Sequence, residues 1–449
     1  MTDNLYQRFQ TVIDRQPEAV FMTTPEGRVI RYGDLPEATA RIAGALVSLG
    51  VKKGDRVAVQ VEKSPETILL YLACLRIGGV YLPLNTAYTG AEIAYFLSDA
   101  EPRLFVCRLE DQAAAEALCA QQTDTRAVTL GTDGNGSLMT AAGSADPYHG
   151  ISSCRGEDLA SILYTSGTTG RSKGAMLTHG NLASNAEALS EIWCFTPKDR
   201  LIHALPIFHI HGLFVACNTV LMAGASMLYL PRFDADPIID AMAEGSVLMG
   251  VPTFYTRLLK SPRLNKASAA NMRLFVSGSA PLTAETHHAF AKRTGQAILE
   301  RYGMTETGMN TSNPYDGERR AGTVGFPLPG VSLRITDPDT GSELPRGEIG
   351  MIEVRGPNVF AGYWRMPEKT AEELRTDGWF ITGDLGLIDE QSYLNIVGRG
   401  KDLVISGGYN VYPKEIEQII DEHPMVEESA VIGLPHPDFG EGVTAVVVA

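Results

Sequence analysis

Positive charge is scarce in this sequence. Lysine and arginine together number 38, against 53 aspartate and glutamate residues, so the formal net charge is −15. Nucleic acids and anionic membrane surfaces are bound through basic faces. The composition therefore argues against nucleic acid and membrane as partners. Any small anionic ligand has to be attracted by local positive charge.

Cysteine is also sparse, and its pattern excludes two kinds of site. The six cysteines form no C-x-x-C pair and no His-Cys cluster with the spacing of metal ligands. Reduced and mostly buried thiols are therefore expected. The N-terminal segment MTDNLYQRFQTVI has an early acidic residue and no long apolar core, so it does not resemble a secretory signal. We expect a cytoplasmic protein.

One long stretch, residues 201–231, contains no Asp, Glu, Lys or Arg and is long enough to span a bilayer. Pro206, Gly212 and Gly224 interrupt it, together with three histidines. It divides into a strand, a loop, a buried helix and a second strand. A core segment of an α/β protein accounts for it better than a membrane span does.

The 449 residues exceed one ordinary domain, and their apolar pattern is typical of an α/β fold. Short apolar runs such as RVAVQVE alternate with helical patterns such as ETILLYLACLRIGG, which predicts parallel sheets covered by helices. After about residue 330 the pattern changes to short β segments separated by Pro- and Gly-rich turns. The segment 124–155, rich in Gly, Ser, Asp and Ala, is expected to be an exposed, mobile loop.

The segment YTSGTTGRSKG at 164–174 has the composition of a phosphate-binding loop. Its three glycines allow backbone N–H groups to turn toward an anion, its hydroxyls can donate to phosphate oxygens, and Arg171 and Lys173 add positive charge. The spacing is not that of a Walker A loop, because no hydroxyl residue follows Lys173. A strand before the loop and a helix after it are expected. A polar surface loop remains the alternative.

Three later segments accompany this loop in order: RYGMTET at 301–307, FITGDLG at 380–386, and GRGKDLVISGGYNVYPKEIE at 398–417. Together the four motifs resemble those of the adenylate-forming superfamily, which includes acyl-CoA synthetases, adenylation domains and luciferases. The resemblance covers essentially the whole chain and is closest to the malonyl-CoA synthetase branch. It implies an AMP-forming acid-thiol ligase that converts malonate, ATP and CoA into malonyl-CoA through a malonyl adenylate, with release of AMP and pyrophosphate.

The resemblance also implies roles for residues at the nucleotide. Glu306 corresponds to the Mg²⁺ ligand, Asp384 to the carboxylate that binds the ribose hydroxyls, and Arg399 to a group reaching the ribose or a phosphate. Glu306 as a helix-cap carboxylate and Tyr302 as a packed core aromatic are the alternatives. The full ATP-binding set is expected to be Thr165, Ser166, Gly167, Thr168, Thr169, Lys173, Ser277, Gly278, Ser279, Ala280, Glu300, Arg301, Tyr302, Gly303, Met304, Thr305, Asp384 and Arg399.

The acid is expected to be bound by His209, Arg257, Ser277 and Met304. A guanidinium in the pocket would pair with the second carboxylate of malonate through two parallel hydrogen bonds, and Arg257 is the residue predicted to do this. Its alternative is an exposed helical arginine, and that of His209 is a hydrogen-bonded core histidine. A short- or medium-chain acyl-CoA synthetase is the alternative enzyme, and whether Arg257 faces the pocket distinguishes the two.

The implied domains are an AMP-binding domain at 1–399, with a β subdomain from about 330, a hinge at 400–402, and an incomplete C-terminal domain at 403–449. Lys401 would lie at the pivot, and Gly407 and Gly408 would border CoA. The catalytic lysine of this superfamily lies in a continuation, and no lysine follows Lys414. A protein ending at Ala449 is therefore expected to be poor at the adenylation step, and an acyl-adenylate binding module without full turnover is an alternative to the ligase. A monomer or weak homo-oligomer is expected.

Overall fold

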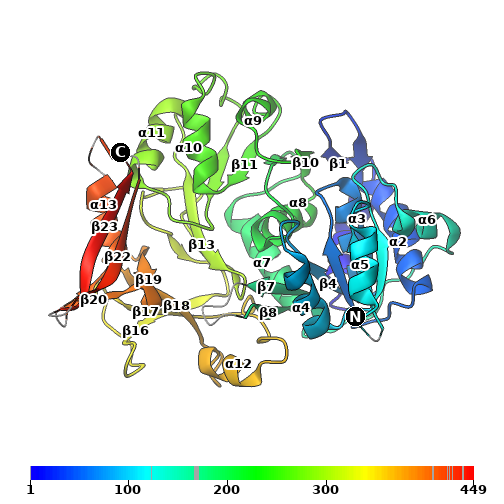
Figure 1. Cartoon of the computed structure of the whole chain (residues 1–449). Coiled ribbons are helices and arrows are strands. Elements are labelled where there is room, and N and C mark those ends of the chain that lie inside the picture. Colours follow the sequence, from blue (N-terminus) through cyan, green and yellow to red (C-terminus); the bar gives the residue numbers. More distant parts are fainter. Residues whose placement is uncertain are drawn as a thin grey trace.

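The computed structural model describes residues 2–122, 124–165, 171–406, 409–421, 423, 425–426, 428–436 and 439–448. In these residues the strands form four sheets, two large and two small (Figure 1). The predicted α/β class, with parallel-rich sheets covered by helices and a small C-terminal unit, is confirmed. The predicted residues 166–169, 407 and 408 lie outside the described part of the chain.

The first sheet is formed by the N-terminal half of the chain. In the described residues it contains six strands in spatial order: β6 (Arg126–Thr129), β5 (Leu104–Cys107), β3 (Arg56–Gln60), β4 (Val80–Pro83), β7 (Leu159–Thr165) and β8 (Lys173–Thr178). All neighbours are parallel except β7 and β8, which are antiparallel. The parallel strands are largely buried, as expected for strands covered on both faces.

The predicted phosphate loop connects β7 to β8, so the expectation of a helix directly after the loop was wrong. Thr165 pairs with Lys173 and Tyr164 with Gly174 across the two strands. The helix begins only at His179, where Thr178 and Asn181 each accept a hydrogen bond from the other's backbone N–H. The apolar residues of the short strand Lys173–Thr178 cannot be distinguished by spacing alone from a first helical turn.

The second sheet contains nine strands in the described residues. Their spatial order is β15 (Phe326–Pro327), β14 (Gly308–Ser312), β13 (Leu299–Met304), β12 (Leu274–Ser277), β11 (Val247–Gly250), β9 (Arg200–His203), β10 (Ser226–Tyr229), β1 (Val20–Thr23) and β2 (Val29–Arg31). The central strands from β13 to β1 are parallel. As predicted, 201–231 contributes two of them, joined by π-helix η2 (His211–Cys217) and α8 (Asn218–Ala223).

Helices cover the two large sheets, and α7 and α8 lie between them in Figure 1. Helix α1 contacts α3, α7 and α8, which joins the two halves of the core. The remaining helices follow in chain order: α1 (Leu5–Arg15), η1 (Tyr32–Asp34), α2 (Leu35–Ser48), α3 (Pro65–Arg76), α4 (Gly90–Ala100), α5 (Gln112–Cys119), α6 (Ser137–Ser144), α7 (His179–Ile192), α9 (Ala235–Ala241), α10 (Pro252–Lys260), α11 (Ala284–Thr294), α12 (Pro367–Glu373) and α13 (Pro413–Asp421).

The segment 124–155 is not the exposed loop that its composition predicted. It contains the edge strand β6, which pairs with β5, and helix α6, which packs against α2. Leu138 and Ala142 of α6 are buried. The many small and polar residues predicted a loop. The helix forms nevertheless, because two apolar side chains are enough to anchor so short a helix to the core.

The two small sheets follow in the chain. One contains β16 (Ser332–Thr336), β17 (Gly350–Arg355), β18 (Phe380–Ile388) and β19 (Leu394–Arg399), and the 3₁₀ turn η3 (Gly400–Asp402) comes next. The other contains β20 (Val404–Ser406), β21 (Tyr409–Val411), β22 (Glu428–His436) and β23 (Gly440–Val448). In the described part of the chain, no helix is long and apolar enough to cross a membrane.

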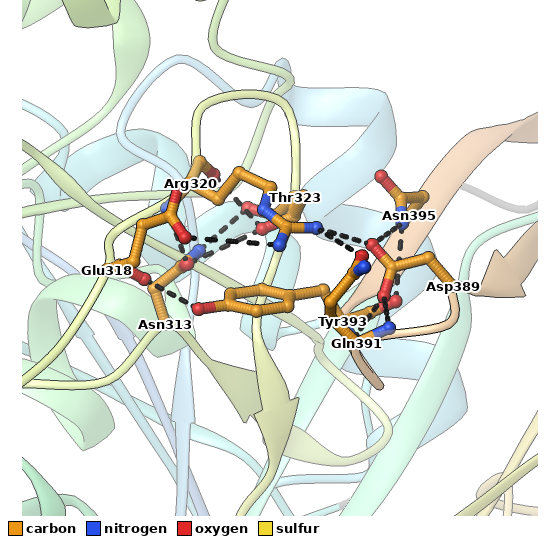
Figure 2. A network of polar contacts seen from close by, with 8 residues as sticks. All are labelled: Asn313, Glu318, Arg320, Thr323, Asp389, Gln391, Tyr393 and Asn395. Carbon is orange, nitrogen blue, oxygen red and sulfur yellow. Dashed lines mark hydrogen bonds and ion pairs between the residues drawn. The ribbon is translucent and has the colours of Figure 1, made fainter.

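A polar network attaches the β16–β19 sheet to the large sheet (Figure 2). Arg320, from the connection between β14 and β15, forms a 2.7 Å ion pair with Asp389 in the β18–β19 turn. Its guanidinium also lies 4.1 Å from the ring centroid of Tyr393, whose hydroxyl donates to the Glu318 carbonyl. These contacts fix β18 and β19 relative to the connection between β14 and β15.

Candidate active site

A cavity of about 630 Å³ opens where the two large sheets and the β16–β19 sheet meet. Segments far apart in the sequence contribute to its wall. Of the predicted site residues, it is lined by Thr165, Lys173, His209, Ser279, Arg301, Gly303, Met304, Thr305, Glu306, Arg399 and Lys401. The fold therefore brings most of the four motifs together around one space.

One side of the cavity carries a lysine and two carboxylates. The Lys173 Nζ atom, at the start of β8, lies 3.3 Å from Oε1 of Glu373 and 4.2 Å from the ring centroid of Tyr363. The Tyr363 hydroxyl lies within hydrogen-bond distance of both Glu306, at 3.0 Å, and Glu373, at 2.6 Å. A cation beside two carboxylates suits a site for a phosphate chain and its counter-ion.

Glu306 is only 5% exposed. Burial raises its pKa, whereas the Tyr363 hydroxyl and the charge of Lys173 act in the opposite direction. A buried carboxylate that faces a cavity is ready to bind a cation. In the described residues, no cluster of three or more His, Cys, Asp or Glu side chains could hold a metal ion by itself.

Asp384 and Arg399 are cross-strand partners on β18 and β19. Arg399 Nε lies 3.0 Å from Oδ1 of Asp384, and the Tyr302 hydroxyl donates a 2.5 Å hydrogen bond to Oδ2. Burial raises the pKa of Asp384, and the positive charge of Arg399 opposes that effect. Both carboxylate oxygens are thus oriented before any ligand binds.

Arg301 brings a buried guanidinium to the cavity wall. Its side chain is 3% exposed, and its Nε and Nη2 atoms have no hydrogen-bond partner in the described part of the chain. Burial lowers its pKa to about 9. An anion would satisfy both nitrogens in one planar arrangement.

Other polar groups lie close to this guanidinium. His211, which also lines the cavity, is near enough to Arg301 for their charges to interact, and its Nδ1 atom lies 3.3 Å from the Ser279 hydroxyl. The Ser277 hydroxyl and His211 Nε2 are buried without a partner among the described residues. Unsatisfied buried polar atoms are uncommon in folded proteins, so the unpaired atoms of Arg301 and His211, which both line the cavity, indicate a place for a polar ligand.

Several predicted residues do not line the cavity in the described part of the chain. Glu300 accepts a 3.2 Å contact from His287, and burial raises its pKa. Ser277 pairs with Glu300 across β12 and β13, and Gly278 follows directly. Tyr302 points its hydroxyl at Asp384, whereas Ala280 is exposed. None of these side chains belongs to the cavity lining among the described residues.

Arg257 is not brought to the cavity. It is exposed on α10, and its guanidinium lies 5.8 Å from the ring centroid of Phe233. The buried face of α10 is formed by Phe254, Tyr255 and Leu258. The arrangement is that of an exposed helical arginine, which was the alternative to a substrate-binding role.

Tyr363 and Glu373 were missed by the sequence reasoning. They belong to 361–373, which has no Gly-rich or motif-like pattern. An isolated β-bridge between Ala175 and Tyr363 brings this segment beside β8. Only the tertiary fold makes them neighbours of Lys173, so no local signal could have identified them.

Comparisons with known proteins extend over nearly the whole chain. The family model described as "AMP-binding enzyme" matches residues 9–364, and that described as "AMP-binding enzyme C-terminal domain" matches residues 415–449. The malonate–CoA ligase of Arabidopsis thaliana is 35% identical over 463 residues, which cover 94% of this chain and 75% of that protein.

Two solved structures are similar as well. The crystal structure of ATP-bound MatB from Rhodopseudomonas palustris is 61% identical, with a TM-score of 0.97 and coverage of 100% of this chain and 88% of that chain. A malonyl-CoA ligase in a ternary product complex with methylmalonyl-CoA and AMP is 37% identical, with a TM-score of 0.74 and coverage of 96% and 89%.

Proposed function

The chain belongs to the AMP-binding enzyme family, and from that premise we propose that it is an ATP-dependent malonate–CoA ligase. The reaction has two steps. A malonate carboxylate oxygen attacks the α-phosphorus of ATP and releases pyrophosphate. The thiol of CoA then attacks the carbonyl carbon of the malonyl adenylate, and AMP leaves.

The phosphate side of the cavity supports the first step. Lys173 supplies positive charge for the β- and γ-phosphates, and Thr165 borders the same space. The assignment of Ser166, Gly167, Thr168 and Thr169 to these phosphates rests on the sequence resemblance. Preorganised cations are effective here because negative charge moves toward pyrophosphate in the transition state.

The residues present fit a Mg²⁺ ion that would be held by Glu306. The carboxylate is buried, faces the cavity and is a hard oxygen donor of the kind that Mg²⁺ prefers. Phosphate oxygens and water would complete the ligand set. When bound, the ion neutralises part of the phosphate charge. Glu306 would orient the phosphates through it, and Tyr363 would hold the carboxylate in place.

Asp384 and Arg399 fit the ribose. Asp384 has two oxygens fixed by Tyr302 and Arg399, each with a further lone pair for a ribose hydroxyl. Lys401 lines the cavity at the turn before β20, consistent with a pivot for the C-terminal unit. The proposal that Gly407 and Gly408 border the pantetheine arm of CoA rests on the sequence resemblance.

The observation that supports malonate most strongly is the unpartnered guanidinium of Arg301. A monocarboxylic acid with an apolar chain would leave this buried cation without a partner, at a substantial free-energy penalty. The second carboxylate of malonate would accept bonds from Nε and Nη2 together, beside His211 and Ser279. We therefore propose Arg301 as the main selectivity residue. For Arg257 to bind that carboxylate, as the sequence predicted, its exposed side chain would have to move toward the cavity.

The test is the rate of CoA-thioester formation by the full-length enzyme with ATP and Mg²⁺, followed by chromatography. Malonate, methylmalonate, acetate, hexanoate, benzoate and isovalerate are compared; isovalerate has an isopropyl group in place of one malonate carboxylate. Malonate is expected to exceed isovalerate in kcat/KM by about 100-fold or more. A monocarboxylate with the highest kcat/KM would instead indicate a short- or medium-chain acyl-CoA synthetase.

A further inference from the structure

A line of hydrogen bonds runs behind the cavity wall from Lys63 to Gly212. Lys63, in the loop between β3 and α3, places Nζ 2.8 Å from Nδ1 of His203 and donates a 2.9 Å hydrogen bond to the His203 carbonyl. On the other side of the ring, His203 Nε2 lies 2.7 Å from the carbonyl oxygen of Gly212. None of these contacts was anticipated by the motifs.

The contacts select one tautomer of His203. Burial lowers the pKa of His203 well below its ordinary value, so the ring is neutral and carries a single N–H. The Gly212 carbonyl can only accept, so the single N–H is on Nε2 and donates to it. Nδ1 is then the acceptor of the hydrogen bond from Lys63 Nζ. The Lys63 Nζ atom also lies 4.4 Å from the ring centroid of Tyr229, which helps to hold it there.

Gly212 occupies a crowded position in the cavity wall. A Cβ atom at 212 would lie 1.9 Å from the carbonyl oxygen of Pro206, and both residues line the cavity. His209 and His211 lie between Pro206 and Gly212 in the chain. Gly212 also belongs to the π-helix η2, a type of element that often occurs at functional sites. The position of its carbonyl therefore affects how the 206–212 segment faces the substrate.

We propose that Lys63 and His203 are positioning residues for the acid-binding side of the cavity. Lys63 donates to Nδ1 and so favours the His203 tautomer with its N–H on Nε2. His203 in turn holds the Gly212 carbonyl, and with it the 206–212 segment. Neither residue lines the cavity among the described residues. They act through the wall, so the KM for the acid should respond to them more than the KM for ATP, which is bound at Lys173, Glu306 and Asp384.

Two substitutions at the same position separate this role from simple packing. In His203→Gln the side-chain amide can place an N–H where Nε2 was, whereas in His203→Asn the shorter side chain reaches only the position of Nδ1. Both remove the ring. His203→Asn is expected to raise the KM for malonate about 10-fold or more, because the buried Gly212 carbonyl loses the Nε2 donor and keeps only the weaker Cys217 thiol, 3.3 Å away, as a side-chain donor. His203→Gln is expected to stay within about threefold of the wild type.

The KM for ATP is measured for both variants and serves as the control for folding of the site. It is expected to change less than about threefold. Equal KM values for malonate in the Gln and Asn variants, or parallel increases for malonate and ATP, would overturn the proposal. If His203→Asn does not fold, Lys63→Met decides the question: a raised KM for malonate supports the proposal, and an unchanged KM overturns it.

The inference rests on the proposed function for its choice of malonate, and the two can fail separately. If the wild-type enzyme does not use malonate, the proposed substrate is wrong. The same variants are then compared with the best acid of the panel. The positioning role fails only if the KM for that acid is equally insensitive to the Gln and Asn substitutions.

Discussion

Gly278 lies directly against the guanidinium of Arg301. A Cβ atom at position 278 would lie 2.5 Å from both Cζ and Nη1 of Arg301, which is closer than such atoms approach in folded proteins. Arg301 is itself buried, so it has little room to give way. Only glycine at 278 is compatible with the observed position of this side chain.

Replacement of Gly278 by alanine should therefore displace Arg301. We expect kcat/KM for malonate to fall about 10-fold or more, with a smaller change in the KM for ATP. Gly143→Ala on α6 is the matched control, because a Cβ there meets no atom within 4 Å. A Gly278→Ala enzyme with the wild-type kcat/KM for malonate would contradict the role given to Arg301.

The hydroxyl of Tyr302 is expected to matter for ATP through Asp384. Tyr302→Phe keeps the buried ring but removes the 2.5 Å hydrogen bond to Oδ2. Asp384 would then be oriented by Arg399 alone. The KM for ATP should rise about 3- to 10-fold, since a donor to a buried charged group is lost. Steady-state kinetics with varied ATP measure this, and an unchanged KM would remove Tyr302 from the nucleotide site.

Glu306→Gln should stabilise the protein while removing activity. Burial raises the folded-state pKa of Glu306, so ionisation is less favourable in the folded protein than in the unfolded chain. The loss of stability is complete at pH values above the pKa of Glu306 in the folded protein. It is absent at pH values below the pKa of the same group in the unfolded chain. The melting temperature of Glu306→Gln should exceed that of the wild type by about 1 to 3 °C at pH 7.5.

The pH dependence of this difference is the critical feature. The gain should shrink as the pH is lowered toward the unfolded pKa, and differential scanning calorimetry at pH 7.5 and 5.5 can follow it. Turnover by Glu306→Gln should fall at least about 100-fold at both pH values. A variant that is less stable than the wild type at pH 7.5 would show that ionised Glu306 is held by favourable contacts.

The network in Figure 2 should contribute to stability. Arg320→Ala removes a 2.7 Å ion pair with Asp389 and the contact with the Tyr393 ring. We expect a loss of about 1 kcal/mol in the free energy of unfolding, or about 1 °C in melting temperature for a chain of this length. Arg41→Ala, which removes an exposed pair with Glu37, should lower the free energy of unfolding by less than about 0.5 kcal/mol. Equal effects of the two substitutions would mean that the network does not hold the sheets together.

Much of the fold could be predicted because the strands of a parallel sheet are read as continuous apolar runs. The run RVAVQVE, which forms β3, was recognisable in this way, and so was the division of 201–231. The strand β8 was mistaken for the beginning of a helix, since its pairing with β7 depends on the hairpin and leaves no separate local signal. Helix α6 was missed for a related reason, because it has only two buried apolar residues.

The motifs predicted Lys173, Glu306 and Asp384, and in the described residues the fold brings Lys173 and Glu306 to the cavity wall while Asp384 is not part of the lining. The contributions of Tyr363 and Glu373 depend on a distant segment packing beside β8. Arg257 and Arg301 illustrate the remaining difficulty. Arg257 was expected to bind the acid and Arg301 to belong to the ATP-binding set, and only the structure shows that the first is exposed and the second buried at the cavity.

The most direct test of the account compares malonate with isovalerate in the wild type, Arg301→Met and Arg257→Ala. Methionine keeps the apolar part of the side chain but cannot bind a carboxylate. If Arg301 binds the second carboxylate of malonate, Arg301→Met lowers the ratio of kcat/KM for malonate over isovalerate by about 100-fold or more, and Arg257→Ala lowers it much less. An Arg301→Met enzyme that keeps the wild-type preference for malonate would contradict this role of Arg301.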